Sequence, residues 1–145
     1  MKKSHFVHIA LSLGFILSIV SCTMSDEAKV RKVATKFADL YFNLDIRKSK
    51  DYCTYELYPV MDHRNAIIKE KDIIYQQKAG KATVEIVKCD INIDNEIAYV
   101  KMAVNNFLRV NYMTDSLFIV PRDTFEIVLT KELDNVWRIK IPTLR

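Results

Sequence analysis

The side chains best suited to acid–base chemistry lie close together in the sequence, between residues 49 and 63. They are Tyr52, Tyr55, Tyr58, Asp62 and His63. An isomerase or dehydratase that moves a proton needs a carboxylate or an imidazole inside an apolar cavity, with a tyrosine to hold the developing oxyanion. Neighbouring residues of a helix point about 100° apart, so Asp62 and His63 would not address the same atom. The sequence therefore favours a surface histidine and a non-catalytic protein, with a proton-transferring enzyme as the alternative.

The first 22 residues have the pattern of a secretory leader that ends at a cysteine. Lys2 and Lys3 precede an apolar run, Phe6–Val20. At 15 residues, this run falls short of the roughly 20 needed to cross a bilayer. The run ends in Ile19-Val20-Ser21-Cys22. These four residues resemble the lipobox of bacterial lipoproteins, in which the cysteine is acylated and becomes the first residue of the mature chain.

The lipobox resemblance implies a signal peptide over residues 1–21, a lipidated Cys22, a tether over residues 22–25 and a single domain over residues 26–145. More than one acyl chain makes attachment to a membrane effectively stable. An Asp after the cysteine favours the inner membrane in lipoproteins of this kind, so Thr23 implies the outer membrane, on its periplasmic or surface side. An ordinary signal peptide that happens to meet a cysteine is the alternative.

The composition of the remaining 124 residues excludes several classes of protein. They carry 20 basic and 18 acidic side chains, because Lys2 and Lys3 leave with the leader, so the net charge is +2. A nucleic-acid-binding domain normally has a much larger basic excess. His63 and Gly80 are the only histidine and glycine left. A dinucleotide fingerprint, a phosphate-binding loop and a multi-histidine metal site are therefore excluded, and no cofactor motif is present.

Two cysteines, Cys53 and Cys89, remain after Cys22 is acylated. In an oxidising compartment, a disulfide between them would close a loop of about 36 residues and stabilise the fold by roughly 3–4 kcal/mol. The alternative is two apolar thiols that are buried separately, since free cysteine is among the most buried residue types. No C-x-x-C motif occurs, so redox catalysis and zinc knuckles have no support.

Helical spacing of apolar residues predicts three helices in the first half of the mature chain. The first spans about residues 26–45 and follows Ser25, a good N-cap. The second spans about 49–58 and ends near Pro59, and the third spans about 60–77. Gly80 closes the helical half. The residues of the third helix that we expect to face inward are Val60, Ile67, Ile68 and Ile74.

After Gly80 the period changes from 3.6 to 2, which predicts strands with one apolar and one polar face. Short turns at Asp94-Asn95 and Asp134-Asn135 indicate an antiparallel sheet of about four strands. Helices followed by strands give an α+β class, with the helices packed on the sheet. The inward residues expected are Val87, Cys89, Ile91, Ile93, Ala98, Val100, Met102, Val104, Phe125, Ile127, Leu129, Trp137, Ile139 and Ile141.

Residues 106–122 leave two interpretations open. Thr114-Asp115-Ser116 fits the tip of a long hairpin, and Leu117–Val120 is apolar at every position. A continuous apolar run is typical of a strand buried on both faces. The other interpretation is a contact surface for a second copy of the chain or for a partner.

The order of these elements resembles the nuclear-transport-factor-two-like, or cystatin-like, superfamily. The likeness covers about residues 26–142 and includes the strand patterns Asn95–Val100 and Asp134–Ile139, with Trp137 packed under the first helix. The resemblance implies a cone in which helices cover a bent sheet and leave an apolar pocket. Some members are ketosteroid isomerases or scytalone dehydratases, many only bind small molecules or proteins, and dimers through the sheet are frequent. Fold alone does not choose among these functions.

Aromatic residues are the candidates for lining such a pocket. Tyr41, Tyr52, Tyr55 and Tyr58 have the amphipathic character of a cavity mouth, and Trp137 would lie near them, although plain helix–sheet packing gives the same pattern. We therefore expect a non-catalytic lipoprotein of the cell envelope that binds a protein partner or a small apolar ligand, with a homodimer through the sheet as a further expectation. No metal, nucleic acid or cofactor is expected.

Overall fold

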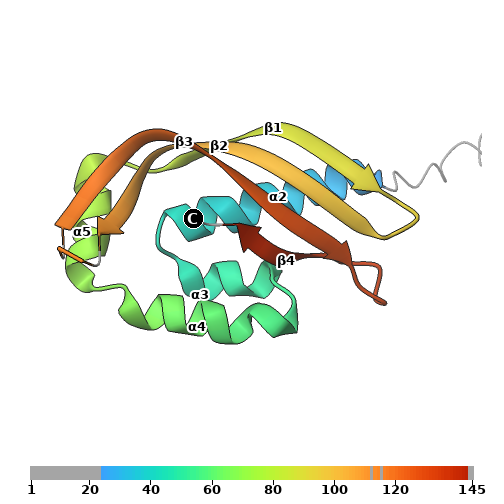
Figure 1. Cartoon of the computed structure of the whole chain (residues 1–145), viewed down its shortest axis with the longest axis horizontal. Helices are drawn as coiled ribbons and strands as arrows, with labels where there is room; N and C mark the ends of the chain where they lie inside the picture. Colours follow the sequence, from blue (N-terminus) through green and yellow to red (C-terminus); the bar gives the residue numbers. More distant parts are fainter. Residues whose placement is uncertain (1–23, 112, 115, 144–145) are drawn as a thin grey trace, which may run out of the picture.

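Helices form the first half of the described chain and strands the second, as the change of period near Gly80 predicts (Figure 1). The computed structural model describes residues 24–111, 113–114 and 116–143. The helical elements are α2 (Asp26–Phe42), α3 (Ile46–Ser49), η1 (Lys50–Tyr52), η2 (Tyr55–Leu57), α4 (Tyr58–Ile67) and α5 (Glu70–Ala79). The strands are β1 (Thr83–Asn92), β2 (Ile97–Asn111), β3 (Ser116–Lys131) and β4 (Trp137–Thr143). The predicted α+β class, with helices on a curved antiparallel sheet, is confirmed.

The first helix begins where the sequence predicts and ends earlier. At its start, the Ser25 side chain accepts a hydrogen bond from a backbone N–H of the first turn (3.2 Å). It ends at Phe42 because the side chain of Asn43 forms hydrogen bonds with the backbone of Ala82, the residue before β1. The Asn43 amide nitrogen donates to the carbonyl of Ala82 (3.1 Å), and its oxygen accepts from the N–H of Ala82 (2.9 Å). This pair of bonds fixes the end of α2 against the start of the sheet.

The predicted second helix, residues 49–58, is wrong. α3 and the single turn η1 lead into Cys53, whose backbone is extended (φ −95°, ψ 158°). Cys53 forms a parallel bridge with Ile139 of β4, and the N–H of Thr54 donates to the carbonyl of Ile139 (2.9 Å). Pairing with the sheet edge interrupts the helix, a long-range effect that helical spacing cannot reveal.

The predicted third helix, residues 60–77, is two helices. The backbone of Ile68 is extended (ψ 126°), which ends α4. A capping interaction then starts α5, since the Asp72 carboxylate accepts the N–H of Lys69 (2.8 Å). Val60, which we expected to face inward, is more than half exposed, and Met61 is the buried residue of α4.

The sheet has the order β1-β2-β3-β4, with each strand antiparallel to the next. The register of β1 against β2 shifts between Ile86 and Lys88. This bulge changes which residues face inward, so Val87 is exposed although alternation predicts it inside, whereas Cys89 keeps its predicted side. Ile93 lies beyond the end of β1 and is also exposed, which corrects a second expected core residue.

β2 and β3 form one long hairpin whose pairing runs from Ile97↔Thr130 to Asn111↔Ser116. Pairing skips the position where Asn106, with a positive φ of 55°, faces Pro121. Proline has no N–H to donate, so a break in the ladder falls at this point. Beyond it the hairpin extends past β1 and β4. The interpretation of Leu117–Val120 as a strand buried on both faces is wrong, because Phe118 is 42% exposed and its neighbours are only half-buried.

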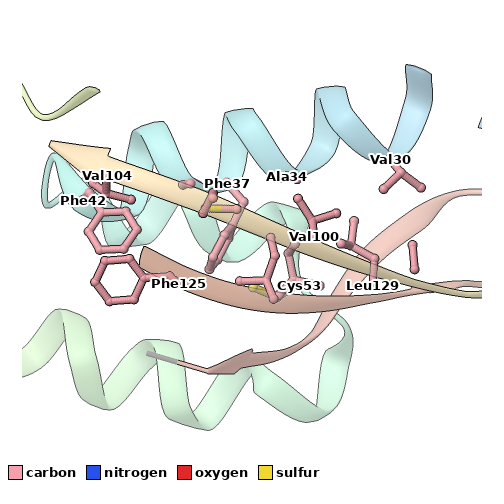
Figure 2. Packing of buried hydrophobic residues seen from close by; sticks show 14 of the residues in the cluster. Val30, Ala34, Phe37, Phe42, Cys53, Val100, Val104, Phe125 and Leu129 are labelled. Carbon is pink, nitrogen blue, oxygen red and sulfur yellow. The ribbon is translucent and has the colours of Figure 1, made fainter. Parts of the chain in front are cut away.

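α2 packs against the concave side of the sheet and contacts all four strands (Figure 1). The core lies between them (Figure 2). Its larger members are Val30, Phe37, Phe42, Ile46, Met61, Val100, Met102, Val104, Phe107, Phe125, Ile127, Leu129, Trp137 and Ile139. Among the described residues, no helix is long and apolar enough to cross a membrane. The predicted signal peptide and Cys22 lie outside the described residues.

Candidate functional site

The concave interior, where the family resemblance implies a pocket, contains a cluster of phenylalanines. The rings of Phe42 and Phe125 lie side by side (Figure 2), with their centroids 4.8 Å apart. The centroid of each ring also lies 5.3 Å from that of Phe107. All three are almost fully buried, and Met61 of α4 is buried in the same core. Rings at these separations are in direct contact. The interior between α2 and the hairpin is thus occupied by side chains at this position.

The five residues expected to line a pocket lie in different surroundings. Tyr41 is half-buried and stacks on Phe37, with ring centroids 5.5 Å apart. Trp137 is a core residue, 2% exposed, whose indole N–H donates to Asp26 at the start of α2 (3.4 Å). As predicted, Trp137 thus lies in the core close to the first helix.

The other three tyrosines lie at or just before the start of α4: Tyr52 ends η1, Tyr55 begins η2 and Tyr58 is the first residue of α4. Tyr52 and Tyr58 are half-buried against the core, whereas Tyr55 is 79% exposed and its ring centroid lies 5.4 Å from that of Tyr58. An exposed ring of this kind does not line an interior. The half-buried pair fits the alternative of plain packing against the core.

The candidate acid and histidine are on the surface. The carboxylate of Asp62 accepts two hydrogen bonds from the ammonium of Lys50 (2.6 and 2.8 Å) and its side chain is 62% exposed. His63, the next residue of α4, is also exposed. Among the described residues the one buried acid is Asp72, whose carboxylate caps the start of α5. Neither Asp62 nor His63 is therefore in the apolar environment that proton transfer in a pocket requires.

Both cysteines carry free thiols, so the structure corrects the disulfide alternative for Cys53 and Cys89. Cys53 is buried beside the outer edge of β4, and Cys89 lies on β1 at the opposite edge of the sheet. Three strands lie between them at about 4.8 Å each, whereas a disulfide requires Cα atoms within about 7 Å. Burial raises the pKa of the Cys53 thiol to about 12, with a further contribution from the charge of Asp51.

α5 turns polar residues toward the protein and leaves apolar residues outside. Asp72 and Gln76, one turn apart, are each 4% exposed. The Gln76 amide nitrogen donates to the carbonyls of Gly80 (2.7 Å) and Asn106 (2.9 Å), which attaches α5 to β2 at the break in the hairpin. Three apolar residues of α5 are each about 40% exposed, namely Ile73, Ile74 and Tyr75. At about 100° per residue, Ile74 lies opposite Asp72 and Gln76, and Ile73 and Tyr75 lie on the two flanks of the helix. The prediction that Ile74 faces inward is therefore wrong.

The end of the β2–β3 hairpin lies at the same end of the molecule as α5 (Figure 1), and α5 contacts both of its strands. Met113 near the hairpin tip and Phe118 of β3 are exposed there. We define the distal surface as the exposed apolar residues of this end, namely Ile73, Ile74, Tyr75, Met113 and Phe118. Exposed apolar side chains that gather at one end of a protein mark a candidate site for contact with a partner.

The outer face of the sheet has a different character. It carries one ion pair within β1, between Lys88 and Asp90 (2.6 Å), and one between Arg122 of β3 and Glu85 of β1 (3.3 Å). It also exposes apolar side chains, including Val87 and Tyr99. These features do not test the expected homodimer through the sheet, which stays a prediction.

No protein family model matches the chain, and no curated protein matches it significantly. Among solved structures, the chain is similar to a protein from Catenulispora acidiphila, with a TM-score of 0.47 and 11% sequence identity over 93% of this chain and 90% of that chain. A likeness at this level defines neither a family nor a function. The resemblance to the nuclear-transport-factor-two-like superfamily stays a prediction.

The sequence reasoning missed most of the distal surface. Phe118 lies in the apolar run Leu117–Val120, for which a contact surface was one of the two interpretations. Asp72 and Gln76 are one turn apart, and that spacing is the signal that could have identified a polar inner side of α5. The burial of Gln76 depends on Asn106, which is 30 residues away, and no local pattern predicts that contact.

Proposed function

We propose that this protein is a lipid-anchored protein of the bacterial envelope that acts, without catalysis, by binding another protein through its distal surface. The anchor part of the proposal rests on the leader and on Cys22, which is followed by a short tether to α2. The order of helices and curved sheet is compatible with the nuclear-transport-factor-two-like superfamily, and we include membership in the proposal.

The observation that carries the binding function is the exposure of Ile74 on the outer side of α5, with Ile73 and Tyr75 exposed on its flanks. Fully burying an exposed apolar side chain of this size contributes about 1.5–3 kcal/mol. Because each side chain is only about 40% exposed, a partner that covers it gains roughly 0.6–1.2 kcal/mol per residue. The polar inner side of α5 is used to attach the helix to β2. The apolar side is therefore free to bind a partner without disturbing the fold.

The position of the distal surface favours a protein partner over a lipid. β2 has 15 residues and connects the end of the molecule where α2 begins with the distal end (Figure 1). At about 3.3 Å per residue, its path is about 50 Å long. A lipid on Cys22 holds the other end at the membrane, so the distal surface faces away from it.

The packed phenylalanine rings inside the fold favour a protein partner over a small apolar ligand. Such ligands bind in cavities that bury most of their surface, whereas the interior near Phe125 is occupied by packed rings. Asp62 and His63 lie on the surface, in contact with solvent and, for Asp62, with Lys50. These observations favour binding over proton-transfer chemistry.

The experiment is crosslinking of the tagged, lipidated protein in intact cells, followed by purification and identification of bound proteins. Wild type, Ile74→Asp and Thr124→Asp are compared, because Thr124 is an exposed residue of the outer sheet face and its substitution adds the same charge. We expect a partner that is lost by at least about tenfold with Ile74→Asp, the effect of a hot-spot residue, and kept with Thr124→Asp. Recovery of a second copy alone, or equal recovery with both variants, contradicts the proposal.

A further inference from the structure

The end of the molecule where α2 begins also exposes apolar side chains. Ile93, in the turn between β1 and β2, is 71% exposed, and Leu133, in the turn between β3 and β4, is fully exposed. Val136 of the second turn and Met24, which precedes α2, are exposed as well. These residues are separate from the distal surface, at the opposite end of the sheet (Figure 1).

Contacts hold the start of α2 and the two turns together. The carboxylate of Asp26 accepts hydrogen bonds from Lys131 (3.2 Å) at the end of β3 and from the indole of Trp137 (3.4 Å) at the start of β4. The N–H of Lys131 donates to the carbonyl of Glu96 (2.9 Å), which joins the β1–β2 turn to the same group. The apolar tips of both turns and the start of α2 therefore form one end of the fold, which we call the tether end.

Both turns are fixed by internal hydrogen bonds. In the second turn, the N–H of Glu132 donates to the carbonyl of Val136 (2.9 Å), and the N–H of Asn135 donates to the carbonyl of Glu132 (2.8 Å). Asn135 has a positive φ of 65°, a conformation that asparagine tolerates better than most residues. Leu133 is thus held in solvent by a defined turn.

The proposed anchor brings the tether end to the membrane. Residues 22–25 connect the lipidated cysteine to α2, and four residues span at most about 14 Å. We propose that Ile93, Leu133 and Val136 insert into the boundary between headgroups and acyl chains of the lipid surface that holds the anchor. This inference rests on the anchoring part of the proposed function.

The charges near these turns favour an apolar contact over an electrostatic one. Lys131 is paired with Asp26 (3.2 Å), and Arg138 is paired with Glu132 (2.6 Å) and with Asp134 (3.6 Å). Basic side chains that are neutralised within the protein attract anionic lipids weakly. The contact should therefore form on zwitterionic bilayers and should persist at high salt.

The test is quenching of site-specific fluorophores by bromine-labelled lipids. The lipidated protein carries Cys89→Ala and one environment-sensitive label, and is reconstituted in phosphatidylcholine vesicles. The label is attached at Leu133→Cys or at Ile93→Cys. The control is a label at Met113→Cys of the distal end. These three sites are highly exposed, so substitution leaves the core unchanged. We expect at least about twofold more quenching at 93 and 133 than at 113, because interfacial groups lie about 5–10 Å deep. Addition of 1 M salt, about a tenfold excess over ordinary ionic strength, should leave this ratio unchanged.

The outcomes separate the two proposals. Intact mass spectrometry of the purified protein reports the lipid on Cys22, and a mass without acyl chains overturns the anchor. A lipidated protein in the vesicle fraction with equal quenching at 93, 133 and 113 keeps the anchor and overturns the insertion of the turns. Loss of quenching at high salt also overturns it, because the contact would then be electrostatic.

Discussion

Replacement of Phe125 by alanine tests whether the interior is a packed core or a ligand cavity. Phe125 is 6% exposed and contacts the rings of Phe42 and Phe107, at 4.8 and 5.3 Å between centroids. Truncation of a buried phenylalanine costs about 3–5 kcal/mol, and we expect the upper part of this range because two ring contacts are lost with it. A domain of about 120 residues has a free energy of unfolding of about 6–18 kcal/mol. The variant should therefore fold, with a large part of its stability removed.

Urea denaturation followed by the fluorescence of Trp137 measures this loss. With an m-value of about 2 kcal/mol per molar urea, the midpoint should fall by about 2 M. Phe118→Ala is the matched control, because Phe118 lies on the same strand and is 42% exposed, so its cost should stay within about 1 kcal/mol. Equal midpoint shifts for the two variants would refute the packed interior and would restore the small-ligand alternative.

Two further predictions concern the thiols and the start of α2. At about pH 8, a pKa of about 12 leaves roughly one Cys53 thiol in ten thousand ionised. A thiol reagent should therefore modify the half-buried Cys89 in the folded protein, and should modify Cys53 only after denaturation. Rapid modification of both thiols would contradict the burial of Cys53. Hydrogen bonds from Lys131 and Trp137 hold the pKa of Asp26 below its ordinary value, so its contribution to stability is complete above about pH 4 and is lost as the pH falls through the folded-state pKa. Asp26→Asn should therefore destabilise the protein more at about pH 6 than at about pH 3. An equal loss in urea midpoint at the two pH values would contradict the lowered pKa of Asp26.

The α+β class and the antiparallel order follow from local patterns that the sequence displays. The apolar spacing of α2 and the turns at Asp94-Asn95 and Asp134-Asn135 depend on residues close in sequence. The errors arose where a distant contact decides the local structure. Cys53 is extended because it pairs with Ile139, although its neighbours have helical spacing.

Two smaller errors have the same origin. Val87 points outward because β1 bulges against β2, and alternation along a single strand cannot reveal a bulge. Ile74 is exposed because Gln76 takes the inner position on α5 by binding the carbonyl of Asn106. A hydrophobic pattern predicts the wrong side when a polar residue has a partner inside the protein.

Candidate site residues were harder to predict than the fold. Residue type identified Tyr52, Tyr55 and Tyr58 as amphipathic side chains, but the exposure of each depends on the turns that interrupt the predicted helix. Apart from Phe118, the exposed apolar residues at the two ends of the molecule are identified by three-dimensional position alone. Isolated apolar residues such as Leu133 in a polar turn are common in sequences and indicate nothing by themselves.

Photo-crosslinking at single positions tests the proposed contact most directly. A photoreactive amino acid is placed at position 74 of the distal surface, or at position 101 of the outer sheet face, in the lipidated protein within its own envelope. The account predicts a covalent adduct of one discrete mass with a different protein from position 74, and none from position 101. No adduct from position 74, or an adduct of twice the protein's own mass, would contradict it.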